Sequence, residues 1–357
     1  MTGYSSERAS PERLRLLGLN HRGASIAVRE RFAVPASRLA EALRSLQAST
    51  EAREAVILST CNRVEVYTLD ASRDSEGWLR DWGGSEFWRQ VEPLRAVGEA
   101  AVGHLFEVAA GLDSMMVGEP QIRTQVRAAM EGAAACGACG HELRRVFVAA
   151  LRAARKSHAA TGLGRLAASV PAVAAETAVR LSAVSAPSRP RVVVVGSGHS
   201  GELALQRLAS LNCAHPPLLV SRSRDHAARV ASRTRAAVAE FSEDLAFARE
   251  ADAIVCATSA PHHLVAPDRL AALMAERAGR PLVIVDVAVP RNVHPAAAAV
   301  PGVSLINIDQ IDTMVAGHGP TRAELAAKAR IIVRDFALEE ARRLAITKAN
   351  CEAGLTH

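Results

Sequence analysis

Short apolar stretches separated by polar turns run through the first 70 residues. Residues 56–58 form a short apolar run, and residues 14–19 and 64–67 are mostly apolar, as expected for buried strands. Residues 36–46 carry leucines at helical spacing, which predicts an amphipathic helix. Strands mixed with helices in this way predict an N-terminal α+β domain.

Helical periodicity dominates the next part of the chain. Residues 104–110 predict a helix that ends at a Gly-Leu-Asp-Ser turn, and Gly118-Glu119-Pro120 breaks the chain before a second helix from Gln121. Residues 142–157 predict a basic helix, whose arginines face either a polyanionic partner or only solvent. The tryptophan-containing residues 72–94 predict a surface helix and loop.

A different pattern begins after residue 160. A helix over residues 172–181 precedes the continuous apolar strand 191–195, and further apolar strands follow at 217–220, 251–257 and 283–289. Gly-x-Gly-x-x-Gly (Gly196, Gly198, Gly201) closes the first of these strands and opens a helix. In that context the glycines predict a Rossmann-type sheet with a pyrophosphate at the helix N-terminus.

These patterns predict an α/β multidomain protein. We expect a disordered N-terminus (1–13), a catalytic α+β domain (14–160), a Rossmann-type NADP-binding domain (161–310) and a C-terminal helical segment (311–357). Gly317-His318-Gly319-Pro320 interrupts this last segment, because proline disfavours a helix interior, and helix resumes near Thr321.

Composition narrows the class of protein. The 357 residues are 49% hydrophobic and 22% charged. No apolar run reaches the roughly 20 residues that span a bilayer, and the polar start is unlike a signal peptide, so we expect a cytoplasmic protein and no membrane partner. The six cysteines are scattered, which favours reduced thiols. A net charge of +6 suits a polyanionic partner, although arginine carries most of it.

The polar stretch between the strands at 56–58 and 64–67 carries candidate chemistry. It reads Ser59-Thr60-Cys61-Asn62-Arg63, and its place at a strand end predicts that the thiol and guanidinium are presented rather than buried. Arg63 either favours the Cys61 thiolate or pairs with a substrate carboxylate. The alternative is that Cys61 is a small core residue.

Four other histidine and cysteine residues are not expected to have a catalytic or metal-binding role. Cys136 and Cys139 form a lone Cys-x-x-Cys without a second ligand pair, so we predict no metal site. His21 is interpreted as a structural histidine and Cys256 as a core residue.

The residues at the end of the second predicted Rossmann strand indicate which cofactor the domain prefers. Ser221, Arg222 and Arg224 suit a 2′-phosphate better than ribose hydroxyls, which favours NADPH over NADH. The glycine turn itself adds the remaining candidate cofactor-binding residues: Gly196, Ser197, Gly198, His199, Ser200 and Gly201.

Several of these motifs resemble the glutamyl-tRNA reductase family. The pentapeptide 59–63, the His-Leu-Phe and Gly-Leu-Asp-Ser to Gly-Glu-Pro-Gln-Ile segment over 104–122, the glycine triplet and the Asp-x-Ala-x-Pro-Arg run at 286–291 all match its motifs. The resemblance extends over residues 14–345. The family normally continues into a dimerisation domain that is shortened here, so a homodimer is in doubt.

The resemblance implies NADPH-dependent reduction of glutamyl-tRNA to glutamate-1-semialdehyde, the first step towards 5-aminolevulinate and porphyrins. Cys61 would attack the aminoacyl ester, and His104 would assist proton transfer or orient the substrate. The downstream aminomutase would be a further partner. The implied substrate-binding residues are Thr60, Asn62, Arg63, Ser114, Glu119, Pro120, Gln121 and Gln125.

Three alternatives stay open from the sequence. The chain could be a shortened paralogue that reduces another aminoacyl-tRNA or serves a specialised pathway. It could instead be a non-catalytic tRNA-binding or regulatory homologue, although such a protein would need neither Cys61 nor the glycine turn. Glu119 and Gln121 could only cap the helix that follows them.

Overall fold

The structure is a computed structural model that describes residues 13–166, 169–183, 190–211, 215–315 and 320–352. By contacts the chain divides into two compact units, residues 1–167 with 318–357, and residues 168–317. The predicted disordered N-terminus, apart from Arg13, and residues 317–319 of the predicted helix interruption lie outside the described residues. Each unit is described by itself.

Unit 1 contains a four-stranded antiparallel sheet in the order β2-β3-β1-β4. Its strands are β1 (Leu14–Asn20), β2 (Glu54–Ser59), β3 (Arg63–Leu69) and β4 (Leu94–Val97). The register pairs Ser59 with Val64, so the predicted apolar runs at 56–58 and 64–67 form one hairpin. Residues 60–62 connect its two strands.

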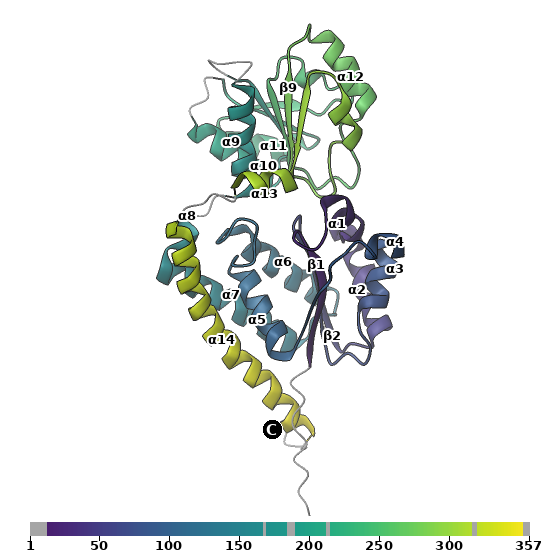
Figure 1. The fold of residues 1–357 in the computed structure, drawn as a ribbon, viewed down its shortest axis with the longest axis vertical. Helices are drawn as coiled ribbons and strands as arrows, with labels where there is room; N and C mark the ends of the chain where they lie inside the picture. Colours follow the sequence, from purple (N-terminus) through teal and green to yellow (C-terminus); the bar gives the residue numbers. More distant parts are fainter. Residues whose placement is uncertain (1–12, 167–168, 184–189, 212–214, 316–319, 353–357) are drawn as a thin grey trace, which may run out of the picture. The chain divides into compact units, whose positions relative to one another are not determined.

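Helices lie on both sides of this sheet, with α1 to α4 on one side and α5 to α7 and α14 on the other (Figure 1). Residues 76–83 and 85–88 are helical, as predicted for this segment. Its placement on the surface is wrong for Trp78 and Trp88, which are buried because their rings complete the core. The helices are α1 (Ile26–Phe32), α2 (Leu39–Thr50), α3 (Glu76–Gly83), α4 (Ser85–Trp88), α5 (Gly98–Ala109), α6 (Gln121–Ala135), α7 (His141–Thr161), α8 (Leu163–Leu166) and α14 (Pro320–Glu352).

The C-terminal helix α14 is part of the hydrophobic core of unit 1. It packs on α5 and α7, and its small and branched residues Ala326, Ala329, Val333 and Ala337 are buried there. Arg145 on α7 and Glu340 on α14 form an ion pair with 3.0 Å between Nε and Oε1. Apolar contact and a shielded ion pair therefore both hold α14 on the unit.

Unit 2 is a six-stranded parallel sheet in the order β10-β9-β8-β5-β6-β7. This is the doubly wound arrangement that the sequence predicts, and strand order reverses between β5 and β8, where such folds bind ligands. Its elements are α9 (Val170–Ser182), β5 (Val192–Val195), α10 (His199–Ser210), β6 (Leu218–Ser221), α11 (Arg224–Thr234), β7 (Ala237–Glu240), β8 (Ala253–Cys256), α12 (Pro267–Glu276), β9 (Leu282–Asp286), β10 (Val303–Asn307) and α13 (Ile308–Val315).

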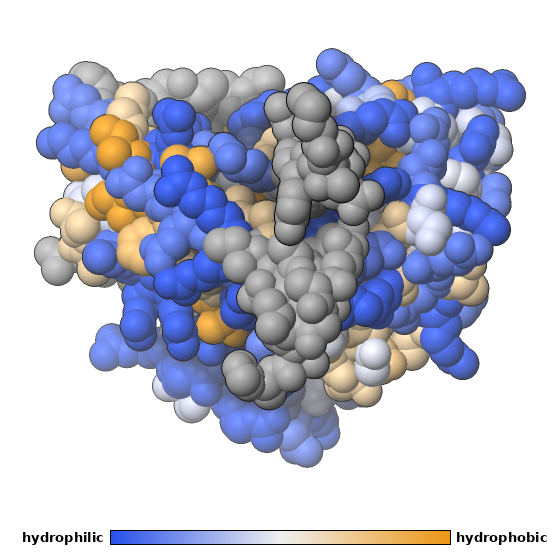
Figure 2. All heavy atoms as spheres, turned by 90° about the horizontal axis from the view of Figure 1, so that it is seen from below, coloured by the Kyte–Doolittle hydropathy of each residue, from blue (hydrophilic) through white to orange (hydrophobic). Residues whose placement is uncertain are grey.

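The face of the molecule drawn in Figure 2 is largely polar. Figure 2 shows a face of mostly hydrophilic residues on which hydrophobic residues form small separate groups. Within the described residues, every helix is too short or too polar to cross a membrane.

Candidate active site

The connection between β2 and β3 is a tight turn that Thr60 organises. The Thr60 hydroxyl accepts hydrogen bonds from the backbone N–H groups of Asn62 (3.2 Å) and Arg63 (3.3 Å). The Thr60 N–H donates to the Arg63 carbonyl at 2.9 Å. A threonine hydroxyl commonly closes a turn in this way, and here it places Cys61 at the tip of the hairpin.

Both negative and positive side chains act on the Cys61 thiol. The residue is partly exposed, and Arg29 Nε donates to its carbonyl oxygen at 3.2 Å. Burial of the thiol and then the charge of Glu119 raise its pKa to about 12, against the opposing effect of Arg29 and Arg63. At pH 8 only about one thiol in ten thousand is then ionised, so attack on an ester requires a proton acceptor.

Arg63 is buried, with 1% of its surface exposed, so the prediction that it is presented to solvent is wrong. Its Nη1 lies 2.6 Å from Glu65 Oε1 and 2.9 Å from Asp113 Oδ2, and its Nη2 donates to the Asp113 carbonyl at 2.6 Å. A buried guanidinium requires such partners, because an unpaired charge in the interior is costly. Among the described residues nothing accepts a hydrogen bond from its Nε.

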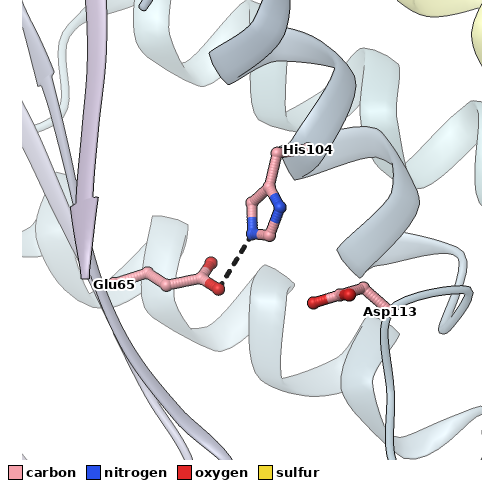
Figure 3. Close-up of side chains that lie close together, drawn as sticks. All are labelled: Glu65, His104 and Asp113. Atoms are coloured by element: carbon pink, nitrogen blue, oxygen red, sulfur yellow. Dashed lines mark hydrogen bonds and ion pairs between the residues drawn. The ribbon is translucent and has the colours of Figure 1, made fainter. Parts of the chain in front are cut away.

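Glu65 is the centre of this network, and Figure 3 shows the hydrogen bond that joins it to His104. Its fully buried carboxylate accepts hydrogen bonds from Arg63, from Tyr67 at 2.7 Å and from His104 Nε2 at 2.9 Å. Burial alone would raise the pKa of Glu65, but the charge of Arg63 with the bonds from His104 and Tyr67 outweighs it and lowers the pKa to about 2. Glu65 therefore fixes both the guanidinium and the imidazole.

Glu65, His104 and Asp113 have ligand atoms within 4.8 Å of one another, which raises the question of a metal ion. The Arg63 guanidinium already contacts both carboxylates of this group. Arg63 therefore supplies the positive charge that a metal ion would otherwise bring to the two carboxylates.

Residues 111–120 form the loop between α5 and α6 and carry three further buried groups: Asp113, Ser114 and Glu119. The Asp113 carboxylate also accepts a hydrogen bond from the exposed Arg22 at 2.7 Å. Burial raises the pKa of Glu119 to about 7 despite the opposing charge of Arg63. A pKa near 7 lets this carboxyl group gain or lose a proton near neutral pH, and its charge acts on the Cys61 thiol, whose pKa it raises.

The remaining predicted substrate-binding residues lie around the same loop and turn. Asn62 is buried, Pro120 is exposed, and Gln121 and Gln125 are half-buried on the first two turns of α6. The helix begins at Gln121, as predicted, and its N-cap residue Pro120 has no capping side chain. Their roles toward a substrate stay predictions.

The glycine turn after β5 has the geometry of a dinucleotide cradle. A Cβ at Gly201 would lie 1.8 Å from the Gly196 carbonyl oxygen, and Gly196 has φ +116° and packs on the Ala257 carbonyl. A Cβ at Gly198 would meet nothing within 4 Å. Close packing at two glycines and open space at Gly198, directly before the N-terminus of α10, fit a bound pyrophosphate.

Hydrogen bonds tie this turn to the end of β6. Ser197 Oγ lies 2.9 Å from Ser221 Oγ and 3.0 Å from His226 Nδ1. Arg222, Arg224 and His226 are exposed, and Arg222 and Arg224 flank the N-cap residue Ser223 of α11. This group of hydroxyls and cations fits a 2′-phosphate.

Two family models match successive parts of the chain. The family model "Glutamyl-tRNAGlu reductase, N-terminal domain" matches residues 17–161, and "Shikimate / quinate 5-dehydrogenase" matches residues 179–314. The glutamyl-tRNA reductase of Myxococcus xanthus is 37% identical over 322 residues, covering 89% of this chain and 71% of that protein. The one of Deinococcus radiodurans is 32% identical over 321 residues and covers 90% of each.

The chain belongs to the glutamyl-tRNA reductase family. The family predicted from the motifs is thereby confirmed, as is the α/β fold with its Rossmann-like domain and C-terminal helix. The solved glutamyl-tRNA reductase of Methanopyrus kandleri is 28% identical, with a TM-score of 0.47, covering 93% of this chain and 79% of that one.

Sequence reasoning missed four residues of the candidate site and the glycine turn: Glu65, Tyr67, Arg29 and His226. Glu65 and Tyr67 follow Arg63 at two-residue spacing, so strand alternation places all three on one face of β3. The alternation in residues 63–67 could therefore have identified Glu65 and Tyr67 from the sequence. Arg29 and His226, by contrast, reach Cys61 and Ser197 across separate elements, and sequence spacing carries no signal for such contacts.

Proposed function

We propose that this chain reduces glutamyl-tRNA to glutamate-1-semialdehyde with NADPH, through a thioester on Cys61, as the first step of 5-aminolevulinate formation for porphyrins. The observation that carries the proposal is the hairpin tip, where a partly exposed thiol, two cations and a carboxyl group of raised pKa meet. Family membership and the Rossmann-like domain support the substrate and the cofactor.

The first step is acyl transfer to sulfur. Cys61 Sγ bonds to the ester carbonyl carbon, the bond from that carbon to the tRNA ribose oxygen breaks, and the tRNA leaves with a free hydroxyl group. Because the thiol pKa is about 12, a base must accept its proton. We assign this role to Glu119, which is largely ionised at pH 8 and can return the proton to the leaving oxygen.

The second step reduces the acyl group. When bound, NADPH would supply a hydride to the thioester carbon. The bond from that carbon to Cys61 Sγ would break to leave the aldehyde, and the sulfur would take up a proton to restore the thiol. Gly196, Gly198 and Gly201 would hold the pyrophosphate, and Ser221, Arg222 and Arg224 the 2′-phosphate. Ser197, His199 and Ser200 lie at the start of α10 beside them.

The buried network would recognise the glutamyl group. We propose that Arg63 holds the side-chain carboxylate of the substrate, since its Nε has no acceptor among the described residues. His104, bonded to Glu65, is then held in one orientation towards the acyl group. Thr60 and Asn62 shape the turn that presents Cys61, and Ser114, Pro120, Gln121 and Gln125 complete the pocket.

The tRNA part of the substrate and the enzyme that uses the product are the next binding partners to consider. Arg144, Arg152 and Arg155 are exposed on α7 and are proposed to contact tRNA phosphates, whereas Arg145 is paired with Glu340. The aldehyde is reactive, which favours direct transfer to the downstream aminomutase. We place the reaction in the cytoplasm, where charged tRNA is made and used.

The test is NADPH oxidation that depends on charged tRNA. Glutamyl-tRNA is expected to give stoichiometric NADPH oxidation and aldehyde, while uncharged tRNA gives neither. Glutaminyl-tRNA, which lacks the side-chain charge, is expected to react far more slowly. Oxidation with a different aminoacyl-tRNA and not with glutamyl-tRNA would support the paralogue instead, and binding without oxidation would support a regulatory homologue.

Glu119→Gln is expected to raise the reactivity of the Cys61 thiol and to lower the rate of turnover. Removing the carboxylate charge lowers the pKa of Cys61, so alkylation by iodoacetamide at pH 8 becomes faster. Removing the proton acceptor lowers the rate of acyl transfer from the tRNA to Cys61 by about 100-fold or more. Alkylation and single-turnover thioester formation, measured from pH 6 to 10, check both effects.

Glu131→Gln, an exposed residue on α6, is the matched control and should leave both rates unchanged. An unchanged alkylation profile in Glu119→Gln would show that this carboxylate does not act on the sulfur. Faster alkylation together with normal acyl transfer would assign the proton to another base.

A further inference from the structure

The loop over residues 111–120 is folded tightly on itself. The Gly118 N–H donates to the Gly111 carbonyl at 2.8 Å, and Gly111 has φ +68°. A Cβ at Gly111 would lie 3.0 Å from the Glu119 carbonyl oxygen. A loop this closely packed moves as one piece, so its contacts to neighbouring helices decide where Asp113 and Glu119 lie.

Three helices of unit 1 hold this loop from outside. His158 Nε2 on α7 lies 2.8 Å from the Ala110 carbonyl oxygen. Leu163 on α8 packs against Gly118, where an added Cβ would be 2.6 Å from its Cγ. From α14, Arg330 Nη2 donates to the Leu112 carbonyl at 3.1 Å.

Arg330 is well placed to act on the loop without supporting the core. Its side chain is 49% exposed, and its Nε lies 4.0 Å from Glu107 Oε1 on α5. The packing of α14 comes from other residues, among them Ala329 and Val333. Loss of the guanidinium therefore leaves the hydrophobic contacts of the helix in place.

We propose that Arg330 is a positioning residue for the reaction proposed above, on which this inference rests. It holds the Leu112 carbonyl, and the next residue, Asp113, binds Arg63 through both its carboxylate and its carbonyl oxygen. The Arg63 guanidinium is thereby kept where it meets the substrate carboxylate. The C-terminal helix thus takes part in substrate recognition by unit 1.

The experiment compares Arg330→Met and Arg330→Lys with Arg334→Met, an exposed arginine one turn further along α14. Loss of one charged hydrogen bond predicts that kcat/KM for glutamyl-tRNA falls about tenfold in Arg330→Met. The ratio of kcat/KM for glutamyl- over glutaminyl-tRNA falls with it. Arg330→Lys recovers part of both, because the amine still donates to the carbonyl, and Arg334→Met behaves as wild type.

A second readout does not depend on activity. Amide hydrogen exchange of residues 112–119 is expected to be faster in Arg330→Met than in Arg334→Met, with the unfolding midpoint of the two variants equal. Wild-type exchange and an unchanged specificity ratio in Arg330→Met would overturn the proposal. If wild type itself did not reduce glutamyl-tRNA, the proposed function would fail, while faster exchange would still show that Arg330 holds the loop.

Discussion

Cys61→Ser is expected to abolish aldehyde formation, with turnover reduced more than about 1,000-fold. A serine hydroxyl at this turn is a far weaker nucleophile than a thiolate, and the hydroxyl forms no thioester for hydride to reduce. NADPH binding should be unchanged, because the residues that would hold it lie in unit 2. Aldehyde formation and NADPH fluorescence titration measure the two properties.

The chain offers a matched control in Cys136→Ser. Cys136 is an exposed free cysteine immediately after α6, so this variant tests for a general effect of losing a thiol. It should retain full activity. Undiminished turnover in Cys61→Ser, or equal losses in both variants, would refute the assignment of Cys61 as the nucleophile.

The local elements of the site could be predicted because their signals are short-range. Apolar runs at 56–58 and 64–67 form the β2–β3 hairpin, and Pro120 marks the start of α6 at Gln121. Gly196 and Gly201 each meet a backbone carbonyl that leaves no room for a side chain. In each case steric limits or strand periodicity within a few residues determine the structure.

The burial of Arg63 could not be predicted, because its cause is long-range. Asp113 is 50 residues away, and His104, which shares Glu65 with Arg63, comes from another helix. A guanidinium at a strand end is usually exposed, and only the convergence of these acidic and hydrogen-bonding groups makes its burial stable. The same holds for Arg330, which meets Leu112 from 218 residues along the chain.

Glu65→Gln is expected to lose both activity and stability. The amide has nearly the shape of the carboxylate but no charge, so among the described residues Asp113 is left as the ion-pair partner of buried Arg63. Breaking a buried ion pair typically costs about 3–5 kcal/mol. Arg63 and His104 also lose their common anchor, and we expect kcat/KM to fall at least about 100-fold.

The dependence of this stability loss on pH tests its cause. The pKa of Glu65 is about 2 in the folded chain against an ordinary value of 4.5, so the folded state binds fewer protons than the unfolded state between these values. The carboxylate therefore stabilises the fold fully above about pH 4.5, and this contribution is lost as pH falls towards 2. The difference in unfolding free energy between wild type and Glu65→Gln should shrink over that window.

Denaturant unfolding at pH 7 and at successively lower pH, down to the limit at which both proteins fold, measures this difference. Tyr67→Phe provides the matched comparison, since it removes a single neutral donor to the Glu65 carboxylate and should cost about 1.5–3 kcal/mol at pH 7. Because this bond is one of several that lower the Glu65 pKa, its cost should shrink less at low pH than that of Glu65→Gln. A difference for Glu65→Gln that stays constant from pH 7 to 3 would mean that shape rather than charge stabilises the network. In that case Arg63 would not depend on the charge of Glu65 for its buried position, which would have to come from Asp113.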